Sequence, residues 1–150
     1  MIVMQKNRRA LPGDVRTFIF DDFIHVVDTL AFLSPAPLNL ISVTGKKEGN
    51  MLYHVVVQFA AGNGFTAIGI MNRDSGTIHE RVEMFTANET QIVTDLKETV
   101  IYSEKKETKL GSNDWESTLY KRGFEQIVDE FLQAAGSGIA LADDGEVLGA

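Results

Sequence analysis

The chain has 150 residues, of which 44% are hydrophobic, and this length suffices for one hydrophobic core but not for two ordinary domains. Its 21 acidic residues outnumber its 14 scattered basic residues, and the resulting formal charge of -7 argues against nucleic acid as a partner. The absence of cysteine excludes disulfides and thiolate chemistry, and no stretch approaches the ~20 apolar residues of a membrane helix, so we expect a soluble cytoplasmic protein.

The first third of the chain predicts two short strands followed by a helix. Residues 2–6 form an apolar run typical of a strand, and residues 15–20 alternate in the way that predicts a second strand. Asp21 and Asp22 come next, where an N-cap and first-turn acids are expected. The apolar spacing that follows predicts a helix over residues 22–33, ended by a segment with two prolines.

The middle of the chain predicts a run of strands joined by short turns. The apolar or alternating runs cover residues 38–44, 52–60, 65–72, 77–86, 91–95 and 98–103. Clusters of turn-forming residues lie at 45–50, 61–64 and 73–76, and the charged run 104–109 predicts a solvated edge or hairpin. Together with the helices, these runs predict an α+β fold, a predominantly antiparallel β-sheet meander packed on one face by helices.

A second amphipathic helix is predicted near the C-terminus. Asn113 and Glu116 have the spacing of a capping box, and apolar residues recur at helical spacing from Trp115 to Leu132. Residues 139–150 are small, acidic and punctuated by glycine, with neither a clear period nor a stop signal. We therefore expect one domain over residues 1–138 and a tail, disordered or altered by where the chain ends, over 139–150.

The residues that point most directly to chemistry lie on the first helix. At about 100° per residue, Asp21, His25 and Asp28 fall on one narrow stripe of an otherwise largely apolar helix. Buried ionisable groups are costly unless paired, so this row should be satisfied internally or face a cleft. A histidine flanked by carboxylates is a candidate general base. The alternative is structural, with Asp21 as an N-cap and His25 as a core histidine bonded to Asp28 or to a backbone carbonyl.

Other candidate sites carry weaker signals. Arg8, in the basic run 6–9, is a candidate for binding a phosphate or carboxylate, although such a run can also be simply solvated. His54 or His79 could join Asp21 and His25 in a metal site, but both are equally consistent with ordinary strand positions, and we expect no metal. The chain contains none of the usual dinucleotide, P-loop or serine-hydrolase motifs, so we expect no cofactor to be bound by this chain alone.

The segment Phe20-Asp21-Asp22-Phe23-Ile24-His25-Val26-Val27-Asp28-Thr29-Leu30 resembles the C-terminal domains of the glucose-fructose oxidoreductase, inositol dehydrogenase and MocA (Gfo/Idh/MocA) family, which carry an Asp-x-x-x-His-x-x-Asp helix. The order of elements over about residues 1–138 is similar too, although Phe18-Ile19-Phe20 replaces the glycines that usually precede the motif. The resemblance implies a fold like that of the C-terminal domain of glyceraldehyde-3-phosphate dehydrogenase. It also implies that this domain binds substrate and forms homo-oligomers through its sheet. The family's N-terminal Rossmann domain, which holds NAD or NADP, is absent from this chain.

The resemblance also implies roles for the residues of the row. His25 would take or return the proton of a hydroxyl on a sugar, polyol or related substrate, with Asp21 orienting it, while Asp28 and Arg8 are the candidates for substrate binding. The resemblance further implies that the chain is a fragment of a dehydrogenase acting on CH-OH groups and is inactive alone. Two alternatives remain: a standalone module with a small-ligand pocket between helix and sheet, and metal-assisted hydrolysis by Asp21, His25 and His54.

Overall fold

The computed structural model describes residues 1–111, 125, 127–129 and 132–133. Met1–Gly111 form one compact unit, and the remaining described residues belong to a second unit, where they are helical. They fall within the predicted late helix, whereas its capping residues, Asn113 and Glu116, and the tail 139–150 lie outside the described residues. None of the helices in the described ranges is long and apolar enough to cross a membrane.

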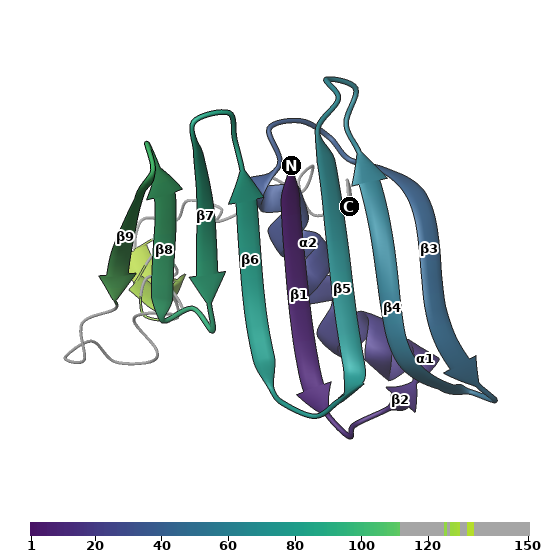
Figure 1. The fold of residues 1–150 in the computed structure, drawn as a ribbon. Helices are drawn as coiled ribbons and strands as arrows, with labels where there is room; N and C mark the ends of the chain where they lie inside the picture. Colours follow the sequence, from purple (N-terminus) through teal and green to yellow (C-terminus); the bar gives the residue numbers. More distant parts are fainter. Residues whose placement is uncertain (112–124, 126, 130–131, 134–150) are drawn as a thin grey trace. The chain divides into compact units, whose positions relative to one another are not determined.

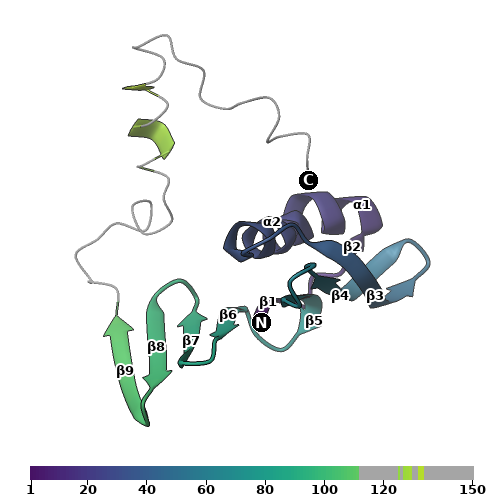
Figure 2. The ribbon, with the colours of Figure 1, turned by 90° about the horizontal axis from the view of Figure 1, so that it is seen from above.

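Within residues 1–111, nine strands form one mixed sheet (Figure 1). The strands are β1 (Ile2–Arg9), β2 (Gly13–Asp14), β3 (Asn39–Glu48), β4 (Met51–Ala60), β5 (Thr66–Ser75), β6 (His79–Phe85), β7 (Glu89–Thr94), β8 (Glu98–Ser103) and β9 (Lys106–Gly111). Their order is β2-β4-β5-β1-β6-β7-β8-β9, with β3 also paired to β4. The neighbours are antiparallel except β1 and β5, which are parallel because β1 inserts between β5 and β6. The predicted fold class, a predominantly antiparallel sheet with helices on one face, is confirmed (Figure 2).

The prediction of a strand at residues 15–20 is wrong, because the chain is helical from Val15 onward. Helix α1 (Val15–Thr17) continues into the π-helical turn η1 (Phe18–Phe23) and then into α2 (Ile24–Leu33). Asp14 is the N-cap, and its Oδ1 accepts a hydrogen bond from the backbone N–H of Thr17 at 3.1 Å. Hydrogen bonds from the Thr17 side chain and backbone hold the pKa of Asp14 below its usual value. The alternation of residues 15–20 therefore does not reflect a strand. Asp21 and Asp22 lie inside the helical segment that begins at Val15 and not in its first turn.

The π-helical turn explains how two phenylalanines five residues apart both reach the core. In a regular α-helix, positions 18 and 23 would differ by about 140° around the axis. A π turn contains one more residue, which brings Phe18 and Phe23 to the same side, and both are buried. Val26 and Leu30 follow three and seven residues after Phe23 and continue that buried side along α2.

The hydrophobic core lies between this helical segment and the central strands. It comprises Ile2, Met4, Phe18, Phe23, Val26, Leu30, Leu52, Val55, Val57, Ala67, Met71 and Val82. The helix packs directly over β5 at Gly69, where a Cβ atom would lie 3.0 Å from Val57 and 3.1 Å from both Val26 and Leu30. Helix and sheet are thus in direct contact, which argues against the small-ligand pocket that a standalone binding module would need between them.

The strand boundaries differ from prediction mainly at two turn clusters. Strand β3 continues through residues 45–48, and β5 continues to Ser75, so that only the ends of the predicted turns at 45–50 and 73–76 are turns. The prediction of a charged edge over residues 104–109 is confirmed, because β9 is the terminal strand of the sheet and is exposed along its length. The extension of β5 matters for the site, because it places Arg73 inside a central strand.

Candidate functional site

The three residues of the predicted row lie together on the outer face of the helix. Asp21, His25 and Asp28 are all exposed, whereas Phe23, Val26 and Leu30 on the opposite face pack against the sheet. The imidazole of His25 makes no hydrogen bond or ion pair with any residue that the structure describes, while its backbone carbonyl accepts a hydrogen bond from the Thr29 hydroxyl at 2.7 Å. The row is therefore accessible from the side away from the sheet.

This geometry shows that the purely structural interpretation of the row, with Asp21 as an N-cap and His25 as a core histidine, is wrong. Asp21 lies well inside the helical segment and is not its N-cap, which is Asp14. His25 is exposed and is not a core histidine. The helix is also less buried than its composition predicts, because three large apolar side chains share its outer face: Phe20, Ile24 and Phe32, the last of which is 86% exposed.

A second cluster of charges lies beneath the π-helical turn, on the side that faces the sheet. The carboxylate of Asp22 lies 3.2 Å from Nζ of Lys6, 3.5 Å from Nη2 of Arg8 and 3.7 Å from Nε of Arg73. The Asp22 side chain is only 15% exposed. One carboxylate is therefore paired with three cations in an environment largely shielded from water. We call Lys6, Arg8, Asp22 and Arg73 the cationic cluster.

The cationic cluster is held by the two parallel strands at the centre of the sheet. Lys6 and Arg8 come from β1, and Arg73 comes from the neighbouring β5, beside the irregularity in the β1–β5 register between Asn7 and Arg9. Arg73 is 8% exposed, and its guanidinium lies 5.5 Å from the centre of the Phe18 ring. A Cβ on Gly13 would lie 2.7 Å from Nη1 of Arg73, so a side chain at position 13 would require the guanidinium to shift.

Sequence reasoning missed most of this cluster. Arg8 is the one member that the sequence marks as a candidate, whereas the sequence pattern predicts a first-turn acid at Asp22 and a turn at Arg73. A signal was available in the helical pattern. Asp22 is four residues after Phe18 and four before Val26, which places it on the buried side of an otherwise apolar stripe. Its partners could not be found that way, because they depend on the parallel pairing of β1 with β5.

The histidines considered for a metal site are not brought together. His54 on β4 is opposite Asn72 on β5, and Asn72 alternates with the helix-facing Met71 and Arg73, so His54 lies on the face of the sheet away from the helix. His79 is 3.6 Å from Asp95 through its Nδ1 atom. Among the described residues, no three His, Asp or Glu side chains gather in a group that could hold a metal ion.

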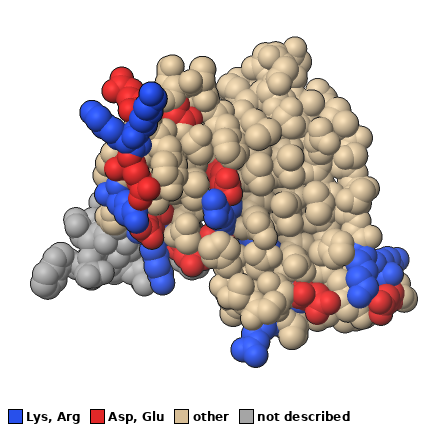
Figure 3. Space-filling view, in the orientation of Figure 1, with Lys and Arg blue, Asp and Glu red and all other residues tan. Residues whose placement is uncertain are grey.

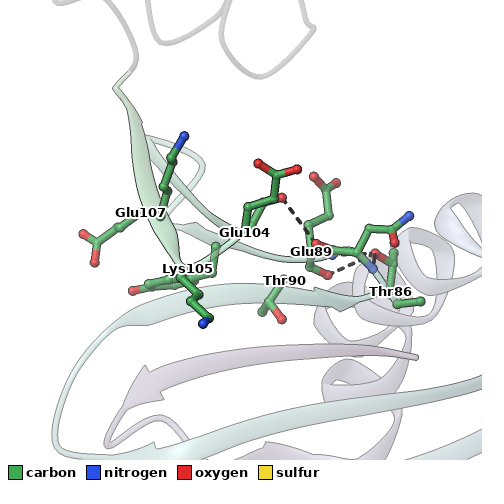
Figure 4. Close-up of a pocket in the computed structure, with 11 residues that line it drawn as sticks. Thr86, Glu89, Thr90, Glu104, Lys105 and Glu107 are labelled. Atoms are coloured by element: carbon green, nitrogen blue, oxygen red, sulfur yellow. Dashed lines mark hydrogen bonds between the residues drawn. The ribbon is translucent and has the colours of Figure 1, made fainter.

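A shallow hollow of about 510 Å³ lies elsewhere on the sheet, between the turn that joins β6 to β7 and the turn that joins β8 to β9 (Figure 4). It is lined by residues 86–90 and 102–107, with Thr86, Glu89, Glu104, Lys105 and Glu107 around it. None of the predicted site residues lines it. Its open, mixed-charge lining lacks the apolar walls of a typical small-molecule site, so the helix remains the candidate functional site.

Comparison with known proteins supplies a relationship for this fold. A family model described as the C-terminal domain of YceM-like proteins matches residues 1–106. YceM of Salmonella typhimurium (strain LT2), provisionally named an oxidoreductase, is 29% identical over 128 residues, which is 81% of this chain and 39% of that protein.

Two solved structures are similar over nearly the whole chain. The dehydrogenase MviM from Clostridium difficile has a TM-score of 0.85 and 27% identity, and the match covers 92% of this chain and 46% of that one. A Gfo/Idh/MocA family oxidoreductase from Vibrio cholerae has a TM-score of 0.79 and 29% identity, and the match covers 94% of this chain and 45% of that one. The chain thus spans less than half the length of these relatives.

Proposed function

Because the chain belongs to the family of YceM-like C-terminal domains, and its relatives are Gfo/Idh/MocA oxidoreductases, we propose that it is the substrate-binding and oligomerisation domain of an NAD(P)-dependent dehydrogenase. Its substrate is a sugar, a polyol or a related hydroxyl compound. The observation that carries the proposal is the exposed row Asp21, His25 and Asp28 on the helical segment, at the positions of the family's Asp-x-x-x-His-x-x-Asp motif.

In this proposal His25 is the general acid and base. An exposed imidazole without a partner among the described residues is free to accept the proton of a substrate hydroxyl as its carbon is oxidised, and to return it in the reverse direction. Asp21, one helical turn before His25, orients the ring and stabilises its protonated form. Asp28 is assigned to substrate binding. Arg8 is the second predicted substrate-binding residue, but it lies in the cationic cluster on the sheet-facing side of the helix and is not part of the row.

The nucleotide, NAD or NADP, belongs mainly to a separate N-terminal Rossmann domain and supplies the hydride acceptor. This chain has no glycine-rich phosphate-binding motif to hold it. The outer face of the helix fits a role opposite such a domain, because Phe20, Ile24 and Phe32 surround the row with exposed apolar surface. Covering that surface would exclude water from the histidine while leaving the sheet free.

The open face of the sheet is the proposed surface for homo-oligomers. On β1, β4 and β5 this face carries uncharged residues, including Val3, Gln5, Val56, Ile68 and Ile70, which alternate with the core-facing residues. Charges begin on the neighbouring β6, where Arg81 and Glu83 form an ion pair opposite Gln5 and Val3. Figure 3 shows this face, with acidic and basic side chains gathered toward β6–β9 and the lower rim. An uncharged sheet face that carries no helix on it is suited to pairing with a second copy.

We expect Ile70→Lys to shift the chain from a dimer or larger oligomer toward monomer, because a charge would be buried in the centre of that interface. The measurement is sedimentation equilibrium of the wild-type and variant chains. Ile78→Lys is the matched control, since Ile78 is 66% exposed between β5 and β6. A wild-type chain that is monomeric at every concentration would remove the oligomerisation part of the proposal.

We expect residues 1–150 alone to give no steady reduction of NAD or NADP with sugars or polyols, because the chain provides the proton-transfer group but not the nucleotide site. The test follows absorbance at the reduced-nicotinamide band for both nucleotides across a panel of sugars and polyols. Sustained turnover by the purified chain would show that residues 1–150 bind the nucleotide themselves. It would contradict the proposal that a separate domain binds the nucleotide while this chain transfers the proton.

A further inference from the structure

The cationic cluster holds more positive charge than its own carboxylate balances. Lys6, Arg8 and Arg73 share the single carboxylate of Asp22. The nearest further carboxylate by strand register is that of Glu80, opposite Lys6 on β6, and it is in no ion pair with the described residues. Concentrated positive charge of this kind is unfavourable in a place screened from water, unless an anion compensates it.

The hydrogen-bonding capacity of the cluster is also unused. Nε and Nη1 of Arg73 are buried and donate no hydrogen bond, since 3.7 Å from Nε to Asp22 is too long for one. Buried donors without an acceptor cost free energy, and native proteins contain few of them. The cluster thus combines excess charge and unpaired donors on two central, hydrogen-bonded strands.

We propose that the cationic cluster binds the oxyanion of a small molecule, a phosphate or a carboxylate group, with Arg8 at its entrance. Arg8 is the most accessible member, with a side chain 33% exposed, while Lys6 and Arg73 form the buried floor. Guanidinium groups present paired donors that match the oxygens of both anions. The anion site is independent of catalysis, and it rests on the proposed function only where the anion is taken to be part of the substrate.

The test is a titration of the 1–150 chain with inorganic phosphate at constant ionic strength, maintained with chloride, followed by amide chemical shifts. We expect saturable shifts at residues of the cluster, centred on Arg8, Asp22 and Arg73. Arg8→Gln should weaken phosphate binding by about tenfold or more, the effect of losing a charge-assisted hydrogen bond. Arg9→Gln, which removes the same charge from the adjacent exposed residue, should leave the dissociation constant within about twofold.

Each result bears on the inference separately from the dehydrogenase proposal, because no turnover is measured. Phosphate shifts that match those caused by chloride, or equal weakening by both arginine variants, would mean that the anion is attracted only by general charge. A parallel titration with acetate distinguishes a phosphate site from a carboxylate site. A phosphate site binds phosphate more tightly than acetate, whereas a carboxylate site binds phosphate and acetate to a similar extent. The wild-type shift map remains decisive even where Arg8→Gln disturbs folding.

Discussion

Asp22→Asn is expected to lower the free energy of unfolding of the chain by about 3 kcal/mol, because it removes the one carboxylate that compensates three cations. Buried ion pairs that lose one partner typically cost about 3–5 kcal/mol, and the lower end applies here because Arg8 is partly exposed to water. The loss should also affect the π-helical turn, since Asp22 connects that turn to β1 and β5. Urea denaturation followed by circular dichroism measures the change.

Asp21→Asn is the matched control for stability. It makes the same chemical change at the adjacent position, but Asp21 is exposed, so we expect an effect within about 0.5 kcal/mol. Equal denaturation midpoints for the two variants would show that the ion pairs of Asp22 contribute nothing to stability.

The fold was predictable from the sequence where hydrophobic period and turn chemistry agree. Strand β8 has the predicted boundaries, residues 98–103, and β9 is the charged edge strand expected beyond it. Prediction failed at residues 15–20, because alternation over six residues is also compatible with a helix that contains a π turn. The position of β1 between β5 and β6 was not predictable, since local patterns carry no information about a parallel pair formed between segments as distant as Ile2–Arg9 and Thr66–Ser75.

The candidate site was predictable only on its outer side. The helical stripe predicts that Asp21, His25 and Asp28 share one face, and in the structure all three are exposed residues of the helical segment. Their exposure was not predicted, since the helix composition suggested burial and the outer face instead carries Phe20 and Phe32. The cationic cluster depends on side chains from β1, β5 and the π-helical turn. Its central residue, Asp22, was not recognised because the predicted helix began at residue 22 and the helical segment begins at Val15.

His25→Ala in a longer protein that joins this chain to the nucleotide-binding domain is expected to lower kcat by about 10²–10⁴-fold, the usual contribution of general acid–base catalysis. Nucleotide affinity should not change, because the nucleotide is held by the other domain. His79→Ala is the matched control, since His79 lies beside Asp95 at the end of β6 and is outside the helix. We expect that control to retain wild-type turnover.

The most direct test of the dehydrogenase assignment combines binding and turnover in that longer protein. Fluorescence titration with NADH and NADPH, with and without His25→Ala, is followed by assays of sugar and polyol oxidation. The account predicts that both proteins bind nucleotide equally and that only the wild type oxidises substrate. Failure of the wild-type protein to bind either nucleotide would contradict the account and leave the domain as a binding or interaction module, with His25 an ordinary surface residue.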